Sequence, residues 1–269
     1  MKKLIYITAI AFGLFSFTSD IGQNKTHITN FAFDKGEVLT YRLHYGIFNA
    51  GVATLKVDKT LHTVKNKKTY RMDVIGSSVG VFRGILKIDD FFRSYVDTES
   101  LTPRKFFREV KEGNYYLKED VFFYPATKKI KVLHTNRHDE KKVNEFSVPT
   151  NVHDIISGFY YLRNIDWSSK NKGDKVRIKA FFEDQLFDME IVYKGKTKVR
   201  TKYGKIHAIK LAPIMPDNDL FEGEDAIEFY LSDDKNHVPL KVRAKMFVGA
   251  VELDIKAYKN LKYKLNKVK

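Results

Sequence analysis

The sequence has 269 residues with a formal net charge of +15, and 43% of its residues are hydrophobic and 14% aromatic. This composition is typical of a folded globular protein and excludes a disordered chain, which would be poorer in aromatic residues. The sequence contains no cysteine, which excludes disulfides, thiolate metal sites, iron–sulfur clusters, a cysteine nucleophile and a cysteine-linked lipid anchor.

Residues 1–22 are predicted to form a secretory signal peptide. Lys2 and Lys3 supply a positively charged start, and an uncharged apolar run follows from Leu4 to Phe17. This run is shorter than the roughly 20 apolar residues that cross a bilayer, so a cleaved signal is favoured over an uncleaved anchor. We expect cleavage between positions 18 and 23.

Export and the positive charge together narrow the expected partners. A basic protein favours anionic neighbours such as phospholipid or lipopolysaccharide head groups and acidic glycans, although such a charge also serves solubility alone. We expect a lipid, a glycolipid or an envelope protein as partner, with no nucleic acid and no cofactor. The expected location is the periplasm or cell envelope of a Gram-negative-like bacterium.

Alternation of apolar and polar residues predicts that the mature chain, residues 23–269, is mainly β and has no transmembrane segment. Residues Val238–Met246 and Val251–Ala257 both alternate, and the short turn between them predicts an antiparallel hairpin. Further strands are expected at Val38–Tyr45, Val52–Val57, Thr69–Ile75, Val176–Phe182 and His207–Leu211.

One segment departs from the strand pattern and is predicted to be a helix. Between Val152 and Ile165 the apolar residues recur at helical spacing, and Asn151 and Asp154 are candidate caps at its start. A shorter helix is expected at Ser78–Leu86.

Adjacent aromatic residues indicate that some strands are covered on both faces or line a cavity on one face, because neighbouring strand residues point in opposite directions. These pairs are Phe91-Phe92, Phe106-Phe107, Tyr115-Tyr116, Phe122-Phe123 and Phe181-Phe182. The expected fold is a single β domain with a large curved antiparallel sheet or half-barrel, bridged by one central helix near residues 152–165. A faint likeness between residues 36–148 and 173–263 leaves open two related β sub-units.

Two groups of residues have the types, though not the pattern, of a catalytic or metal site. His153, Asp154 and Ser157 are the residue types of a hydrolase triad, but neighbours on one helix rarely point as a triad requires, so helix capping is expected. His134 and His138 have an H-x3-H spacing, yet their flanks predict a polar hairpin loop in place of a helical metal site. We therefore predict no catalytic residue and no metal ligand.

Two charged regions also have a functional and a structural interpretation. The acidic run 217–225 is rich in oxygen ligands but lacks the spacing of a calcium loop, which favours a solvated loop. The strand residues Arg177 and Lys179, and the set Lys241, Arg243 and Lys245, could bind anions or protect the sheet against aggregation.

Three stretches of the sequence resemble the domain-of-unknown-function 3108 family of exported bacterial proteins. The first, Tyr45–Leu55, has the pattern Y-G-x-x-x-A-G-x-A-x-L, and the second, Asp154–Arg163, has D-x-x-S-x-x-Y-Y-x-R. The third runs from Tyr203-Gly204 through Ala208-Ile209 to Val238-Pro239-Leu240. The resemblance covers nearly all of the mature chain and implies an envelope or periplasmic β protein without an established activity, substrate or cofactor.

The second pattern singles out Asp154, Ser157 and Arg163, which we expect to anchor the helix against the sheet. A ligand site is expected to be lined by the aromatic residues Phe91, Phe107, Phe123, Phe159, Tyr161 and Phe182. We predict a non-enzymatic binding or scaffolding module for an amphiphilic or anionic ligand. The alternatives are a hydrolase acting on envelope polymers and a structural partner of an envelope assembly machine.

Overall fold

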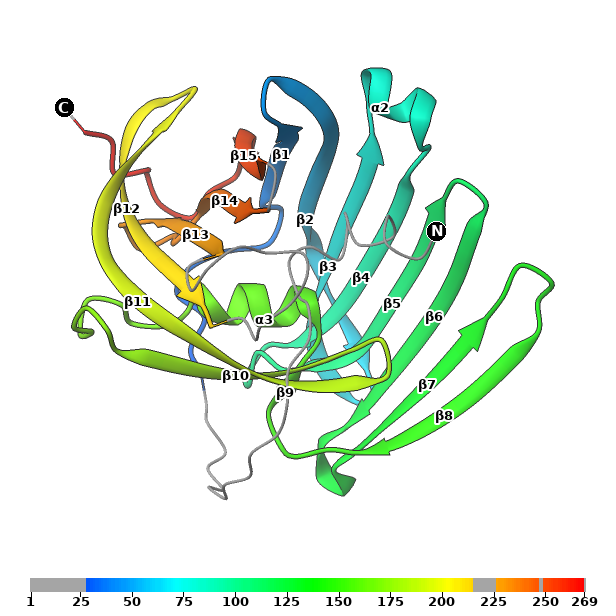
Figure 1. The fold of residues 1–269 in the computed structure, drawn as a ribbon. Helices are drawn as coiled ribbons and strands as arrows, with labels where there is room; N and C mark the ends of the chain where they lie inside the picture. Colours follow the sequence, from blue (N-terminus) through cyan, green and yellow to red (C-terminus); the bar gives the residue numbers. More distant parts are fainter. Residues whose placement is uncertain (1–27, 215–225, 247–248, 269) are drawn as a thin grey trace.

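The computed structural model describes residues 28–214, 226–246 and 249–268, which form one open, strongly curved sheet of 15 strands (Figure 1). Neighbouring strands are antiparallel throughout, except for a short parallel pair between β9 and β10. The prediction of a large curved antiparallel sheet is therefore confirmed. The predicted signal peptide, residues 1–22, and the acidic run 217–225 lie outside the described residues.

The first eight strands form one half of the sheet, each pairing with the next along the chain. Their bounds are β1 Val38–Tyr45, β2 Phe48–Val64, β3 Lys67–Ser78, β4 Asp89–Asp97, β5 Pro103–Glu112, β6 Tyr115–Tyr124, β7 Lys129–Thr135 and β8 Lys141–Ser147. A short helix, α2 (Gly80–Ile85), connects β3 to β4, and a single 3₁₀ turn, η1 (Pro125–Thr127), connects β6 to β7.

The remaining strands form the other half, and a central helix, α3 (Ile155–Leu162), lies between the two halves (Figure 1). Their bounds are β9 Val152–His153, β10 Lys175–Phe182, β11 Gln185–Thr201, β12 Gly204–Pro213, β13 Ile227–Ser232, β14 Pro239–Lys245 and β15 Ala250–Lys259. The expected hairpin at 238–257 is the β14–β15 pair, and both expected helices form inside their predicted ranges.

The two halves join where the first strand pairs with the last. β1 pairs with β2 on one side and with β15 on the other, so Leu43 faces both Gly51 and Leu253 across the sheet. The strands nearest the two ends of the chain thus occupy the middle of the sheet.

Adjacent aromatic residues on β4 and β5 do point to opposite faces. Ser94 on β4 bonds to Asp154 at the start of α3, so the residues that alternate with Ser94 define the inner face, on which the helix packs. Phe92 and Phe106 stack on this inner face, with ring centroids 6.3 Å apart. On the outer face, Phe91 and Phe107 form a second pair at 6.0 Å.

Helix α3 lies between two hydrophobic cores because its apolar residues face both halves of the sheet. Ile156 and Tyr160 belong to a core that spans the first half and reaches strands of the second, whereas Leu162 packs with Trp167 in a core formed by the second half alone. Phe159 and Ile155 contact both cores. No helix in the described ranges is long and apolar enough to span a bilayer.

Candidate functional site

The start of α3 is closed by a reciprocal capping box. The side chain of Asp154 accepts hydrogen bonds from the backbone N–H groups of Ile156 and Ser157, at 2.9 and 2.8 Å. In return, the backbone N–H of Asp154 donates to Ser157 Oγ at 3.0 Å, and that hydroxyl donates to Asp154 O at 3.2 Å. Ser94 Oγ adds a bond of 2.5 Å to Asp154 Oδ2 from β4. The buried Ser157 hydroxyl is thus occupied by the backbone of the helix start.

His153 faces away from this capping box. Its ring packs on Tyr161 at 4.8 Å between centroids, and burial lowers its pKa to about 4. Among the contacts of the described chain, no hydrogen bond joins the His153 ring to Ser157. A serine hydrolase needs its base in contact with its nucleophile. His153, Asp154 and Ser157 therefore do not form a catalytic triad.

The end of α3 is held by a buried ion pair. Arg163 donates to both oxygens of Glu37, with Nη1–Oε1 at 2.6 Å and Nη2–Oε2 at 2.8 Å, and neither side chain has any exposed surface. The guanidinium also donates to the carbonyls of Asn236 and Ala32. Burial opposes its charge, but Glu37 outweighs that effect and raises the pKa of Arg163. The structure thus gives Arg163 partners in two distant segments of the chain, residues 32–37 and Asn236.

The six aromatic residues expected to line a ligand site do not come together. Phe123 and Phe182 are buried in the two cores. Phe159 and Tyr161 lie on α3. Phe91 and Phe107 lie on the outer face, away from the helix. A single aromatic cavity built from all six is therefore absent, and only the outer pair lies on the surface of the sheet.

Phe91 and Phe107 belong to a larger apolar group on the outer face, which we call the outer stripe: Ile75, Phe91, Phe107 and Phe122. Ile75 faces Phe91 across the β3–β4 pair, and Phe122 lies two strands further along on β6. These side chains are intermediate in burial, apart from Ile75, which is 41% exposed.

Cationic side chains lie over each ring of the outer stripe. The Arg93 guanidinium is 4.9 Å from the Phe91 centroid, and Lys118 Nζ is 5.8 Å from that of Phe107. Lys105 Nζ lies 5.0 Å from the Phe122 centroid. Arg93 and Lys105 also form ion pairs with Asp73 and Asp120. The stripe thus combines apolar rings with positive charge, in the range where cation–π attraction operates.

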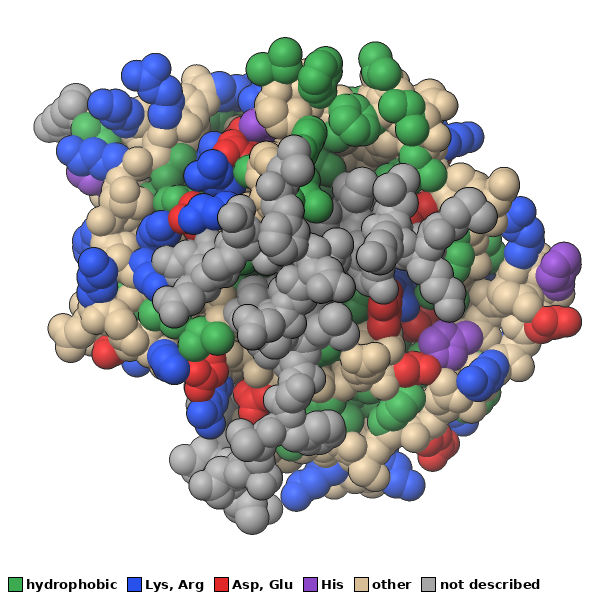
Figure 2. All heavy atoms as spheres, viewed as in Figure 1, with side chains coloured by type: hydrophobic (Ala, Val, Ile, Leu, Met, Phe, Trp, Pro, Cys, Tyr) green, Lys and Arg blue, Asp and Glu red, His purple; other side chains and the backbone are tan. Residues whose placement is uncertain are grey.

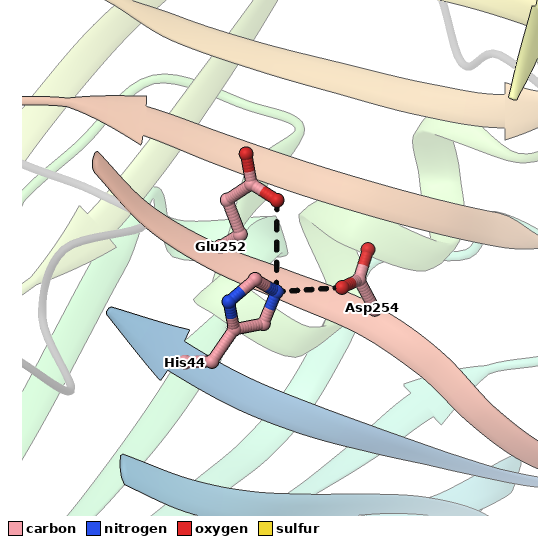
Figure 3. A group of neighbouring side chains, drawn as sticks. All are labelled: His44, Glu252 and Asp254. Carbon is pink, nitrogen blue, oxygen red and sulfur yellow. Dashed lines mark hydrogen bonds and ion pairs between the residues drawn. The ribbon is translucent and has the colours of Figure 1, made fainter. Parts of the chain in front are cut away.

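A second cluster of chemically capable residues lies on the same outer face where β1, β15 and β14 meet (Figure 3). His44 Nε2 is 2.7 Å from Asp254 Oδ2 and 3.6 Å from Glu252 Oε2, and Nδ1 is 2.9 Å from the carbonyl of Gly46. The spacing of the three side chains is compatible with a metal ion.

Cationic neighbours already balance those carboxylates. Lys241 Nζ lies 2.7 Å from Glu252 Oε2 and 3.1 Å from Asp254 Oδ1, and Arg243 Nε lies 3.1 Å from Glu252 Oε1. A divalent cation would be repelled by these groups, so the cluster is better described as a ladder of ion pairs across the sheet. The charges of Lys241 and Arg243, predicted to bind anions or protect the sheet, are thus largely neutralised.

A third cluster joins the two halves of the sheet at the tip of the β10–β11 hairpin. His134 on β7 places Nδ1 3.3 Å from Glu119 and Nε2 3.0 Å from Asp184 in the hairpin turn. Asn144 donates to Asp184 at 2.6 Å. His138 lies in the β7–β8 turn and takes no part, so the H-x3-H pair does not form a site. Sequence reasoning missed this cluster because its members come from four separate strands and turns.

Arg108 already supplies a buried positive charge to this third cluster, so the cluster is better described as a contact that holds the hairpin than as a cation site. We call Arg108, Glu119, His134, Asn144, Glu183 and Asp184 together the latch. The Arg108 guanidinium is buried and bonds to Glu119 at 3.1 Å and to Glu183 of the hairpin turn at 3.1 Å. It also lies 4.5 Å from the Phe182 ring. The hairpin tip is therefore fixed to the first half of the sheet by charge-assisted bonds.

Comparison with known proteins identifies the family. The family described as "Protein of unknown function (DUF3108)" matches residues 40–256. The chain belongs to the DUF3108 family. No curated protein matches the sequence.

One solved structure similar to this DUF3108 chain is named β-barrel-like, and two more distant ones are named differently. A beta-barrel-like protein of domain of unknown function DUF1849 from Brucella abortus has a TM-score of 0.54 at 9% identity, with 87% of this chain and 100% of that chain covered. A protein from Bacteroides fragilis, named as exported with a YmcC-like fold, has a TM-score of 0.37 at 7% identity and the same coverage. A protein from Parabacteroides distasonis, named as a lipoprotein, has a TM-score of 0.35 at 11% identity and the same coverage. The likeness to the Brucella protein supports the fold alone.

The anchoring role expected for Arg163 in this DUF3108 chain leads to a first prediction. Arg163→Met leaves the Glu37 carboxylate buried without its partner, so the free energy of unfolding in urea should fall by about 3–5 kcal/mol. Adding Glu37→Leu should restore much of the loss, because the unpaired charge is then removed. As a control, Arg177→Met removes an exposed pair with Glu190 and should change the stability far less. Equal stability of Arg163→Met and the parent would rule out the anchoring role.

The start of α3 leads to a second prediction, on pH. Burial raises the pKa of Asp154 from 3.8 to about 6, so between these values the folded state holds a proton that the unfolded chain has released, and stability falls as pH rises. Burial lowers the pKa of His153 from 6.5 to about 4, so there the unfolded chain holds the extra proton, and stability rises with pH.

The two residues change the free energy of unfolding in opposite directions, each by an amount on the order of 3 kcal/mol. Replacing one of them should therefore reveal the pH dependence that the other causes. Asp154→Asn should give an unfolding free energy that increases from pH 4 to 6.5, and His153→Phe one that decreases over that range. The parent protein should be flatter than either. Parallel pH profiles for all three proteins, measured by urea unfolding, would contradict the assignment.

The latch leads to a third prediction. His134→Phe removes the bonds to Glu119 and Asp184, so hydrogen exchange of the backbone amides at 183–185 should become about tenfold faster. His138→Phe is the matched control, because it alters an exposed histidine of the neighbouring turn. Unchanged exchange at 183–185 in His134→Phe would show that Arg108 and Asn144 hold the hairpin without His134.

Proposed function

We propose that this chain is a non-enzymatic binding or scaffolding protein of the bacterial cell envelope, and that its ligand is an amphiphile with an anionic group. The protein would be exported by its N-terminal signal segment and act in the periplasm or at the envelope surface of a Gram-negative-like bacterium. The observation that carries the proposal is the outer stripe, where apolar rings and cations share one surface.

The polar residues of α3 support a role without catalysis. Ser157 is occupied by the capping box, and Arg163 by its ion pair with Glu37. An acid, a base or a nucleophile must reach a substrate to act on it, whereas these side chains are buried among their own partners. The contacts of these residues therefore support a structural role for them at the two ends of the helix.

The outer stripe supports the choice of ligand. An acyl chain would lie along Ile75, Phe91, Phe107 and Phe122, and a phosphate or carboxylate would meet the ammonium groups above the rings. Lys118 is well placed for the anionic group, because it lies over Phe107 near the middle of the stripe. Apolar contacts would supply most of the affinity and the cations its preference for anions.

Native mass spectrometry of the mature protein, purified gently from the exported fraction of its own cells, tests the proposal. We expect a bound mass of lipid or glycolipid size that is lost on denaturation. Phe91→Ala with Phe107→Ala removes two rings of the stripe, so the bound fraction should fall about tenfold or more. Leu61→Ala, which alters a 40% exposed apolar residue outside the stripe, is the matched control.

Two results would contradict the proposal. A clean unliganded mass for the parent protein would exclude a tightly held amphiphile. Retention of the ligand by the double variant, with unchanged circular dichroism, would place the ligand elsewhere and reject the outer stripe as its site.

A further inference from the structure

The connections at one end of strands β1–β4 carry the most exposed apolar side chains of the described chain. Ile47 in the β1–β2 turn and Phe48 at the start of β2 are 91% and 58% exposed, and Val81 and Ile85 on α2 are 75% and 73% exposed. Every other large apolar side chain in the described ranges is less exposed than these four. We call these four residues the apolar rim.

The two parts of the apolar rim lie side by side. The backbone N–H of Val79, just before α2, donates to the carbonyl of Ala50, just after the β1–β2 turn, at 3.0 Å. Figure 1 shows the turn and α2 at the same end of the neighbouring strands β1–β4, and Figure 2 shows apolar side chains gathered there. A contiguous exposed group of this kind marks a contact surface, whereas single exposed apolar residues do not.

The apolar rim is held in this exposed position by its own hydrogen bonds. Arg83 on α2 donates to the carbonyls of Ser78 and Ile88 and forms a bidentate pair with Asp89 at 2.9 and 3.0 Å. The backbone N–H of Leu86 donates to Phe82 O at 2.8 Å. The apolar side chains thus project from a turn with fixed geometry.

The charges at the rim are positive. Within Gly46–Phe48 and Gly80–Lys87 the only charged residues are Arg83 and Lys87, and neither segment contains a carboxylate. Asp89, the next acidic residue, is paired with Arg83, while Lys87 is 69% exposed and lies 3.9 Å from the same carboxylate. The rim thus presents exposed apolar side chains with cations beside them. This arrangement matches an anionic membrane surface, in which the acyl chains lie below the charged head groups.

We propose that the apolar rim docks this protein on a lipid bilayer with anionic head groups. Ile47, Phe48, Val81 and Ile85 enter the acyl region, and Lys87 contacts the head groups. This goes beyond ligand binding at the outer stripe, because it concerns a different surface and does not depend on a bound amphiphile. A second copy of the chain fits less well: four side chains cover well under the about 800 Å² per partner that a stable interface buries.

Flotation of the full mature protein with lipid vesicles tests this proposal. The vesicles contain phosphatidylethanolamine and phosphatidylglycerol in a 3:1 ratio, with pure phosphatidylcholine vesicles for comparison. We expect the parent protein to float with the anionic vesicles. Ile47→Asn with Val81→Asn should lower the partition about a hundredfold, because two inserted side chains are lost.

Two further variants make the test specific. Val143→Asn alters a 51% exposed apolar residue on β8 and should bind vesicles as the parent does. Lys87→Gln should weaken binding several-fold on anionic vesicles and leave binding to phosphatidylcholine unchanged. Because all the altered side chains are exposed, circular dichroism should be unchanged in every variant.

Insertion can be followed separately by Ile47→Trp. Its fluorescence should be quenched by lipids brominated on their acyl chains, while the native Trp167 is buried and gives a constant background. The proposal is overturned if the parent protein fails to float, or if the double variant floats as the parent does. It is also overturned if the rim variants abolish a dimer seen by light scattering while vesicle binding is absent, since the rim would then contact a second copy. The bound mass found by native mass spectrometry is unaffected by any of these results, so the two proposals can fail independently.

Discussion

The architecture depends on the buried ion pair between Glu37 and Arg163. A charge without access to water is tolerated only when its partner and hydrogen bonds are all in place, so the pair requires several segments to assemble together. Glu37 comes just before β1, Arg163 just after α3, and the guanidinium also bonds to the carbonyls of Ala32 and Asn236. Because replacement of such pairs by apolar residues is often neutral or stabilising, the pair is better seen as selecting one arrangement of the helix than as a source of stability. The apolar residues of α3 pack in the two cores, and the ion pair contacts the end of the helix.

The sequence predicted much of the local structure because strands and helices space their apolar residues with different periods. Alternation placed β1 at Val38–Tyr45, as the structure has it, and helical spacing placed α3 within 152–165. Partners distant in sequence could not be found in this way. Arg163 and Glu37 are 126 residues apart, and His44 and Asp254 are 210 apart, so neither contact leaves a local pattern. The aromatic residues show the same limit: alternation says that neighbours face opposite ways, but only the packed sheet shows which of them is inside.

The patterns that resemble the family describe the fold more than its chemistry. In the first pattern, Gly51 packs so closely that an added Cβ would lie 2.9 Å from the carbonyl of Ser77, and Gly46 has a φ of +55°. In the second, Asp154 and Ser157 close the start of α3, and Arg163 holds its end. Each of these residues makes its contacts within the fold of this chain. The outer stripe and the apolar rim are the surfaces that could distinguish one member from another. Both lie outside the second pattern. In the first pattern, Ile47 and Phe48 of the apolar rim stand at positions marked x, where any residue is allowed.

The pairing of β1 with β15 has a consequence for how the chain is made. A polypeptide emerges from the ribosome with its N-terminal part first, so β1 is available long before its partner. Until residues 250–259 arrive, β1 has one satisfied edge, toward β2, and one open edge that can pair with another chain. In the nascent chain, β1 is therefore an edge strand until β15 is made, although it lies in the middle of the finished sheet. Any truncation before β15 would leave β1 as an edge strand permanently. The sheet can be completed only when β15 has been made and pairs with β1. This favours folding after release from the ribosome over folding strand by strand during synthesis.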